Sequence, residues 1–490
     1  MAPVQWVPAD SGDCGAGEGD DGREEVRAGL LLLFAALAEA QVLTLQEVLQ
    51  SVEKSYPPLL AALQEKQAAE GDLLSALGRF DTMFRARFDT DQIGFYDNER
   101  VDVGVEQATT KWGTTYYGGW RLGEGSFAPY DGKLDTRSYG EFRAGMKMPL
   151  LRDRAIDSRR ADLQKADLNR RIAALSIDQQ KIVILQTATR RYWEWVAAGR
   201  RYTVAEQLLE LAMKRNNDLK ESVRLGQTPA IEVAENERAI LQRRSQLVEA
   251  ERALQLATID LSLFYRTPDG KPQMAAASQL PGGFPEQAAL TAEQIEDDIE
   301  TALRRRPEVE RLIVQRRQTQ VDAALGKNQR LPNMDVLLSF TRESGTGAVR
   351  RGPTELKGSL VFDLPLQRRT AEGRIINAEA RLNQIAQREQ FTRDQITAEV
   401  QDAISAVQTA FRRAKLIAEE VQVARQLEDA ERTKFDLGDS TLFLVNLREQ
   451  ATFDAAVREV AAQADYFRAQ ALYELAIAEA LAPTRKPSVK

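Results

Sequence analysis

Two stretches decide how this chain folds: "VRLGQTPAIEVAENER" (Val223–Arg238) and "FDLGDSTLFLVNLREQ" (Phe435–Gln450). In both, Leu-Gly is followed two places later by a hydroxyl residue, and Val, Glu and Ala stand at matching offsets. Glycine readily adopts the left-handed conformation that ends a helix, so we expect Gly226 and Gly438 to end two helices. The chain is therefore expected to turn sharply at two equivalent places.

Each turn is expected to start a returning helix. Thr228 and Ser440 carry hydroxyl groups that can accept hydrogen bonds from the first amides of a helix, and Pro229 suits a first helical position. The helical pattern before the turns covers about 150–224 and 366–437, and after them about 230–265 and 442–480. Roughly 70 residues at 1.5 Å each make a helix on the order of 105 Å long.

Four segments alternate apolar and polar residues, which is the period of a β-strand. They are "MFRARFD" (83–89), "EFRAGMKMP" (141–149), "DVLLSFTR" (335–342) and "LKGSLVFDLP" (356–365). Each apolar face is matched by a polar face, so these strands are expected to separate two different environments.

The whole pattern occurs twice. Shorter helices over 44–77 and 295–326 are both broken by proline, at Pro57 and Pro307, which are 250 residues apart. Pro149 and Pro365, after the returning strands, are only 216 apart, so the first half carries additional residues within Asp89–Ser138. This insert contains "KWGTTYYGGW" and fits either an extra hairpin or a long external loop.

The duplication gives a domain plan. We expect a first repeat over 42–265 with strands at about 80–148, a linker over 266–294, a second repeat over 295–482 with strands at about 333–364, and a tail over 483–490. Residues 1–40 include "AGLLLLFAALAEA" after Arg27, which is typical of a secretory signal peptide and too short to span a bilayer. The acidic stretch before it favours a true start near Val26.

The composition excludes several functions. The net charge is −7, with no basic block that would follow a nucleic acid backbone. The chain has no histidine and one cysteine, Cys14, so disulfide frameworks and His-dependent catalysis are excluded. We expect no catalytic residues, no metal site and no cofactor.

The four strands cannot close a barrel within one chain, and open sheet edges are not tolerated in lipid. Several copies must therefore share a barrel. Alternating strands joined to an export signal favour an outer-membrane barrel, while the alternative for any single hairpin is a soluble sheet buried on one face.

The chain resembles the TolC-like outer-membrane efflux proteins. The resemblance covers about 42–481 and rests on the two-fold repeat, the strand-to-helix junctions "MPLLRDRAIDSRR" and "DLPLQRRTAEGR", and the two glycine turns. It implies a mainly α protein with membrane β-strands: a homotrimer with one outer-membrane β-barrel continued by a periplasmic α-helical barrel. It also implies a passive duct of a tripartite efflux or type I secretion system, which works with a periplasmic adaptor and an inner-membrane pump.

The resemblance gives the two turns a role, because they would form the periplasmic tip of the tunnel. It implies adaptor docking at the Leu-Gly pairs, Leu225 with Gly226 and Leu437 with Gly438. The plainer interpretation is that the glycines only end helices.

The same resemblance implies a narrow aperture lined six and nine places after each turn glycine. Those places hold Glu232 and Glu235 in the first half and Leu444 and Leu447 in the second, so a mixed acidic and apolar gate is expected. The alternative is that the two acids only favour a helix N-terminus.

Three aromatics within the first long helix, Tyr192, Trp193 and Trp195, are interpreted as helix-packing residues between protomers. The competing function is a periplasmic coiled-coil scaffold, which would be extracted without detergent. The exported substrate stays open, because a passive duct takes its specificity from the attached pump.

Overall fold

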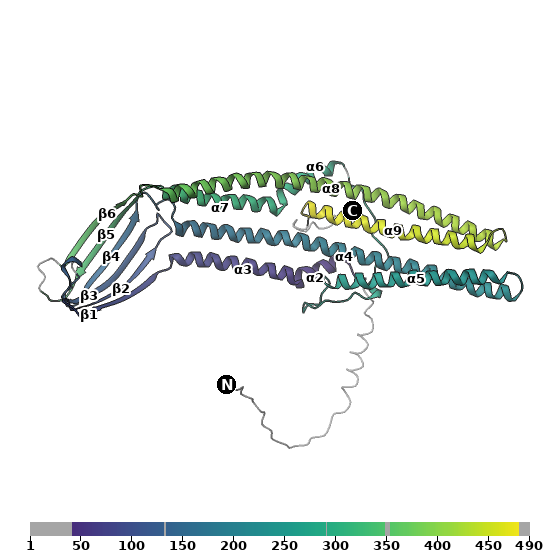
Figure 1. The fold of residues 1–490 in the computed structure, drawn as a ribbon, viewed down its shortest axis with the longest axis horizontal. Coiled ribbons are helices and arrows are strands. Elements are labelled where there is room, and N and C mark those ends of the chain that lie inside the picture. The colour runs from purple at the N-terminus through teal and green to yellow at the C-terminus, as the bar shows by residue number, and fades with distance from the viewer. Residues whose placement is uncertain (1–41, 132–133, 291, 348–352, 480–490) are drawn as a thin grey trace, which may run out of the picture.

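The computed structural model describes residues 42–131, 134–290, 292–347 and 353–479. The expected signal peptide within 1–40 and the tail over 483–490 lie outside the described residues. The molecule is elongated: a β-sheet lies at one end and two helix-to-helix turns lie at the other (Figure 1).

Two long helices connect these ends. Helix α4 (Ser158–Arg224) has 67 residues and α8 (Arg369–Asp436) has 68, so each is about 100 Å long. Helix α5 (Ala230–Ser262) returns along α4, and α9 (Leu442–Ala476) returns along α8. The predicted long and returning helices are confirmed. Within the described ranges, none of the helices has the length and apolarity needed to cross a bilayer.

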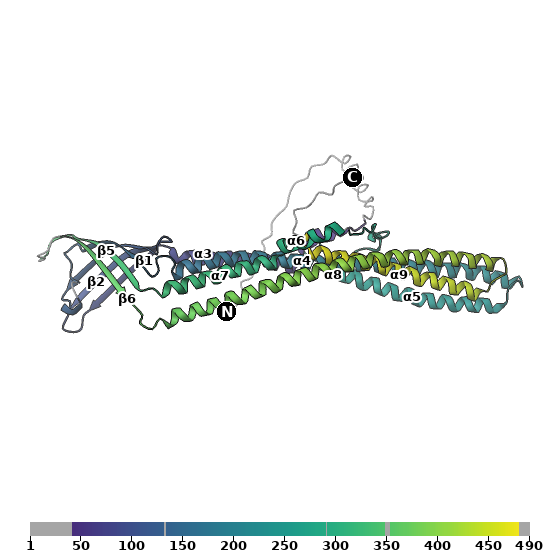
Figure 2. The ribbon, with the colours of Figure 1, turned by 90° about the horizontal axis from the view of Figure 1, so that it is seen from above.

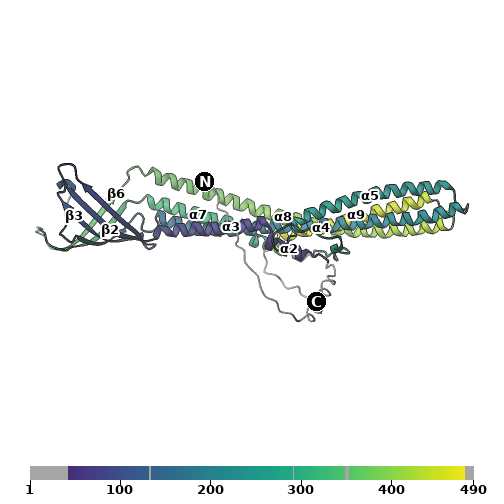
Figure 3. The same ribbon diagram turned by 90° about the horizontal axis from the view of Figure 1, so that it is seen from below.

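Four shorter helices complete the part nearer the sheet. They are α2 (Leu45–Ser55), α3 (Pro57–Leu77), α6 (Ala292–Arg305) and α7 (Pro307–Gln329). The predicted breaks at the two prolines are confirmed. Figures 2 and 3 show α8 displaced near the sheet from the layer of α3, α4 and α7, so these four helices form an arc.

The sheet is antiparallel throughout, in the order β1-β2-β3-β4-β5-β6. Its strands are β1 (Met83–Asp91), β2 (Asn98–Ala108), β3 (Thr115–Gly125), β4 (Glu141–Pro149), β5 (Asn333–Glu343) and β6 (Thr354–Asp363). The four predicted strands are confirmed as β1, β4, β5 and β6. The insert, whose strand count the sequence left open, forms β2 and β3, so the extra hairpin is the correct alternative and the sheet has six strands.

Short 3₁₀ turns and a linker complete the path. The turns are Gly78–Phe80, Pro129–Asp131 and Ala277–Gln279. The linker after α5 packs on the middle of the helices, where the main hydrophobic cluster of the described residues includes several aromatic side chains.

The cluster corrects one prediction. Trp195 is 1% exposed, and the Trp193 ring stacks on Phe467 of α9 at 4.3 Å and near Phe284 of the linker. The Tyr192 hydroxyl donates to the Leu43 carbonyl at 2.9 Å. These aromatics do pack helices, but the prediction that they pack between protomers is wrong, because the chain's own linker and α9 cover them.

Candidate functional site

The two glycine turns are built in the same way. Gly226 and Gly438 have φ of 73° and 84°, in the left-handed region. In the first turn the Gln227 amide donates to the Ser222 carbonyl at 2.9 Å, and the Gly226 amide donates to Val223 at 3.0 Å. The second turn has the same pair of bonds, from Asp439 to Lys434 and from Gly438 to Phe435. This is the Schellman arrangement, so the prediction that these glycines end helices is confirmed.

The predicted capping residues are wrong. Pro229 and Thr441 directly precede α5 and α9, and neither helix receives a side-chain capping bond there. Pro229 therefore stands before the first helical position, and Thr228 does not cap α5. The Ser440 hydroxyl instead donates to the Glu431 carboxylate of α8 at 2.5 Å, which draws it away from the start of α9.

The four residues predicted to dock an adaptor lie together at the end of the molecule opposite the sheet (Figure 1). Leu225 is 55% exposed and Leu437 is 77% exposed. A Cβ added at Gly226 or Gly438 would meet no atom of the described residues within 4 Å. The end therefore presents two open apolar turns, and docking there stays a prediction.

The predicted aperture residues lie in the first two turns of α5 and of α9. Glu235 accepts a hydrogen bond from Arg238 at 2.7 Å, and this bond holds the pKa of its carboxyl below the usual value. One oxygen of Glu232 is buried and has no hydrogen-bonding partner in the part of the chain that the structure describes. Leu444 and Leu447 are exposed. Whether these four line a pore stays a prediction.

A charged cluster near this end was missed by the sequence reasoning. Glu449 of α9 is fully buried, and its carboxylate pairs with Arg243 of α5 at 2.7 Å and with Arg432 of α8 at 3.2 Å. Arg215 of α4 pairs with the same carboxylate. One carboxylate therefore joins side chains from all four helices of the tip.

Glu449 stays ionised although it is buried. Burial alone would raise the pKa of Glu449, but Arg215 and Arg243 outweigh it and lower that pKa, so the group stays a carboxylate. Two neutral partners satisfy the arginines further: Arg215 donates to Asn446 at 3.0 Å, and Arg243 donates to the Leu208 carbonyl at 3.1 Å. The cluster thus fixes the α4–α5 hairpin to the α8–α9 hairpin.

No local sequence pattern predicts this cluster. Glu237 occupies the position equivalent to Glu449 in the first turn motif, yet it pairs with Lys220 at 3.1 Å on the surface, where both side chains are about half exposed. The same residue type at the same offset is therefore a surface group in one hairpin and a buried anchor in the other.

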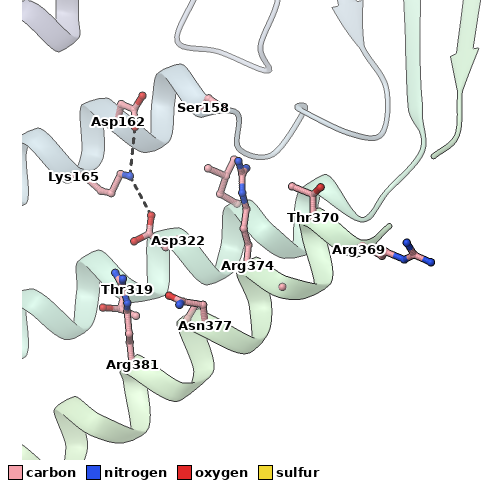
Figure 4. Close-up of a pocket in the computed structure, with 13 residues that line it drawn as sticks. Ser158, Asp162, Lys165, Thr319, Asp322, Arg369, Thr370, Arg374, Asn377 and Arg381 are labelled. Carbon is pink, nitrogen blue, oxygen red and sulfur yellow. Dashed lines mark ion pairs between the residues drawn. The ribbon is translucent and has the colours of Figure 1, made fainter. Parts of the chain in front are cut away.

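Near the sheet, α4, α7 and α8 enclose a hollow of about 620 Å³ (Figure 4). Lys165 bridges Asp162 at 3.4 Å and Asp322 at 3.1 Å, while Arg374 and Arg381 come from α8. Because α7 lies between the other two helices, a hollow that touches all three lies on the inner side of the arc. Among the described residues, no cluster of acidic or sulfur side chains could hold a metal ion.

The sheet has two chemically different faces. Large apolar side chains on one face are exposed, with Leu356 79% exposed and Phe84 65% exposed. The other face carries ion pairs, such as Lys147 with Asp335 at 2.9 Å. Apolar side chains in contact with water are unfavourable at this density, so this face requires an apolar environment.

Comparisons with known proteins agree with this geometry. No protein-family model matches the chain, and no curated protein matches its sequence. Solved structures of outer-membrane proteins do match its shape. The CmeC outer membrane channel of Campylobacter jejuni is 14% identical, with 89% of this chain and 85% of that chain covered and a TM-score of 0.60.

The outer membrane protein VceC of Vibrio cholerae is 14% identical, with 89% and 96% covered and a TM-score of 0.59. The open state of the MtrE outer membrane channel of Neisseria gonorrhoeae is 12% identical, with 89% and 88% covered and a TM-score of 0.61. The match extends over most of each chain. This protein therefore has the fold of the TolC-like outer-membrane channels.

Proposed function

We propose that this protein is a passive exit duct in the outer membrane, with a long periplasmic extension, and that it serves a tripartite efflux or type I secretion system. The observation that carries the proposal is the exposed apolar face of the sheet, held at the end of helices about 100 Å long. Such a face suits lipid, and helices of that length suit a tunnel through the periplasm. The duct performs no catalysis.

The sheet requires other copies of the chain. Strands β1 and β6 are the edges of the sheet, and each has only one neighbouring strand in the described structure. A sheet in lipid must close on itself, because unpaired backbone groups there cost several kcal/mol each. We propose a homotrimer, as the fold resemblance implies, in which β6 of one copy pairs with β1 of the next.

The far end is proposed to meet a periplasmic adaptor, which connects the duct to an inner-membrane pump. The exposed Leu225 and Leu437 would supply the apolar contact, and the turn glycines would allow close approach. A photo-reactive amino acid at position 437 should cross-link a periplasmic protein in native cells, and Leu225→Ser should weaken that cross-link. A leucine of similar exposure away from the turns, Leu241, provides the control as Leu241→Ser. Loss of cross-linking in the control alone would place docking elsewhere.

The aperture is proposed to lie at Glu232, Glu235, Leu444 and Leu447. In planar bilayers, Glu232→Gln with Glu235→Gln should reduce cation selectivity, because the acidic tier loses its charge. Unchanged selectivity would show that neither Glu232 nor Glu235 lines the pore.

Purification tests the function as a whole. A protein that needs detergent, inserts into lipid bilayers and forms discrete conducting channels supports the duct. A soluble protein that never conducts would support the alternative, a periplasmic coiled-coil scaffold.

A further inference from the structure

The additional hairpin continues the apolar face without a gap. Register places Val101, Val103 and Val105 of β2 opposite Phe88, Ala86 and Phe84 of β1. The same three valines lie opposite Leu122, Trp120 and Gly118 of β3, and Trp120 and Gly118 lie opposite Phe142 and Ala144 of β4. The apolar face therefore runs through the hairpin and on to β5 and β6, where Phe340 is paired with Ala144 and Leu356.

The charged face is continuous as well. Asp102 of β2 pairs with Arg143 of β4, so the pair reaches across β3. At the crossing point β3 has Gly119, which is opposite Arg143 and has no side chain to block the contact. Arg121 of β3 pairs with Glu141 of β4 at 2.5 Å. Ion pairs thus join the hairpin to β4, on the face that would line the water-filled lumen of the proposed channel.

The hairpin also has the length of a membrane strand. Strands β2 and β3 have 11 residues each, and a tilted strand needs about 9–11 to cross the hydrocarbon. Their connecting turn is anchored next to the helices: Gly113 lies against Pro149 and the Arg160 side chain at the start of α4. The hairpin therefore spans the same height as its neighbours.

We propose that β2 and β3 are part of the transmembrane wall, so that three copies of the six-stranded sheet close a barrel of 18 strands. This inference rests on the proposed function. The edges suit such closure, because β1 runs away from the helices and β6 runs back toward them, which allows antiparallel pairing between copies.

The strand number sets the width of the exit. With strands about 4.8 Å apart and tilted by about 40°, 18 strands give a backbone radius of about 18 Å, against about 12 Å for four strands per copy. Barrels of 16–18 strands leave an aqueous channel, whereas narrow barrels are filled by side chains. The exit is therefore wide enough for bulky hydrated cargo. Its lumen charges are largely paired with each other, so it selects only weakly by sign.

Cysteine accessibility in the full chain tests this inference, with the native thiol removed by Cys14→Ser. Val103→Cys in the hairpin and Ala144→Cys in β4 lie on the apolar face. Thr115→Cys in β3 and Ser339→Cys in β5 lie on the opposite face. The variants are reconstituted in liposomes and treated with a water-soluble maleimide, and labelling after denaturation shows that every thiol is intact.

We expect Thr115→Cys and Ser339→Cys to react at least about tenfold faster than Val103→Cys and Ala144→Cys, because the reactive thiolate does not form in hydrocarbon. Rapid labelling of Val103→Cys with protection of Ala144→Cys would overturn the 18-stranded barrel and leave the duct intact. Rapid labelling of both would show that the sheet is not in the membrane, and the proposed function itself would fail.

Discussion

Replacing Glu449 by glutamine should loosen the tip of the molecule far more than its surroundings. Among the described residues, the change removes the only negative charge in an ion pair with Arg215 or Arg243, both of which are largely buried. Removing one partner of a buried ion pair typically costs about 3–5 kcal/mol, because the remaining charge stays buried without compensation. Glutamine has nearly the same shape, so the loss reflects charge and not a cavity.

Hydrogen exchange read peptide by peptide is the appropriate assay, because the effect should be local. Amides of α5 and α9 near the cluster should exchange more than about 100-fold faster, which corresponds to about 3 kcal/mol. The sheet should be unaffected.

The matched control is Glu237→Gln. Its pair with Lys220 is exposed, and such pairs contribute about 0–1 kcal/mol. If both variants exchange alike, the buried carboxylate does not hold the hairpins together and the reasoning is refuted.

Three further outcomes follow from individual residues. Gly199→Ala should destabilise the chain, because a Cβ there would overlap Leu280. At Gly373 a Cβ would meet no atom of the described residues within 4 Å, so Gly373→Ala should stabilise α8 by about 0.5–1 kcal/mol. Thermal midpoints that move in the same direction for both variants would contradict this. Burial raises the pKa of Glu474 from 4.5 to about 7, so the folded state binds a proton that the unfolded state releases, and stability should fall as pH rises through this window. Glu474→Gln should flatten that slope in melting experiments. The contribution of Glu449 to stability depends on pH in the opposite sense. Because the pKa of Glu449 is lowered in the folded state, this stabilisation is present above pH 4.5 and is lost as the pH falls further. Acid should therefore increase hydrogen exchange at the tip before it does so elsewhere.

Much of the fold could be predicted because backbone rules act locally. The turn glycines, the helix-breaking prolines and the alternating strands each leave a signal within a few residues. The hairpin of β2 and β3 was harder to recognise. Val101, Val103 and Val105 do alternate, but the glycines at 104, 118 and 119 leave gaps in the pattern. Gly104 and Gly119 are required by close backbone contact between the two strands: a Cβ at Gly104 would lie 2.9 Å from the Gly118 carbonyl, and one at Gly119 would lie 2.5 Å from the Val103 carbonyl.

The contacts between distant segments could not be predicted. Nothing local distinguishes Glu449 from Glu237, since burial of the former depends on arginines from three other helices. Ser440 was expected to cap the helix that follows it, but its hydroxyl donates to the Glu431 carboxylate of α8 instead. Gly199 lies within a long helix because any larger residue there would overlap Leu280, which stands some 80 residues later in the chain. Pairings of this kind are decided by packing, which a sequence pattern does not contain.

The most direct test of the central claim is a cryo-electron microscopy map of the protein purified from membranes in detergent. We expect a three-fold tapered cylinder in which six strands from each copy close one barrel, with the two glycine turns of every copy at the opposite end. Separate rods without a closed barrel would contradict the account, since the apolar face of the sheet would then never meet lipid.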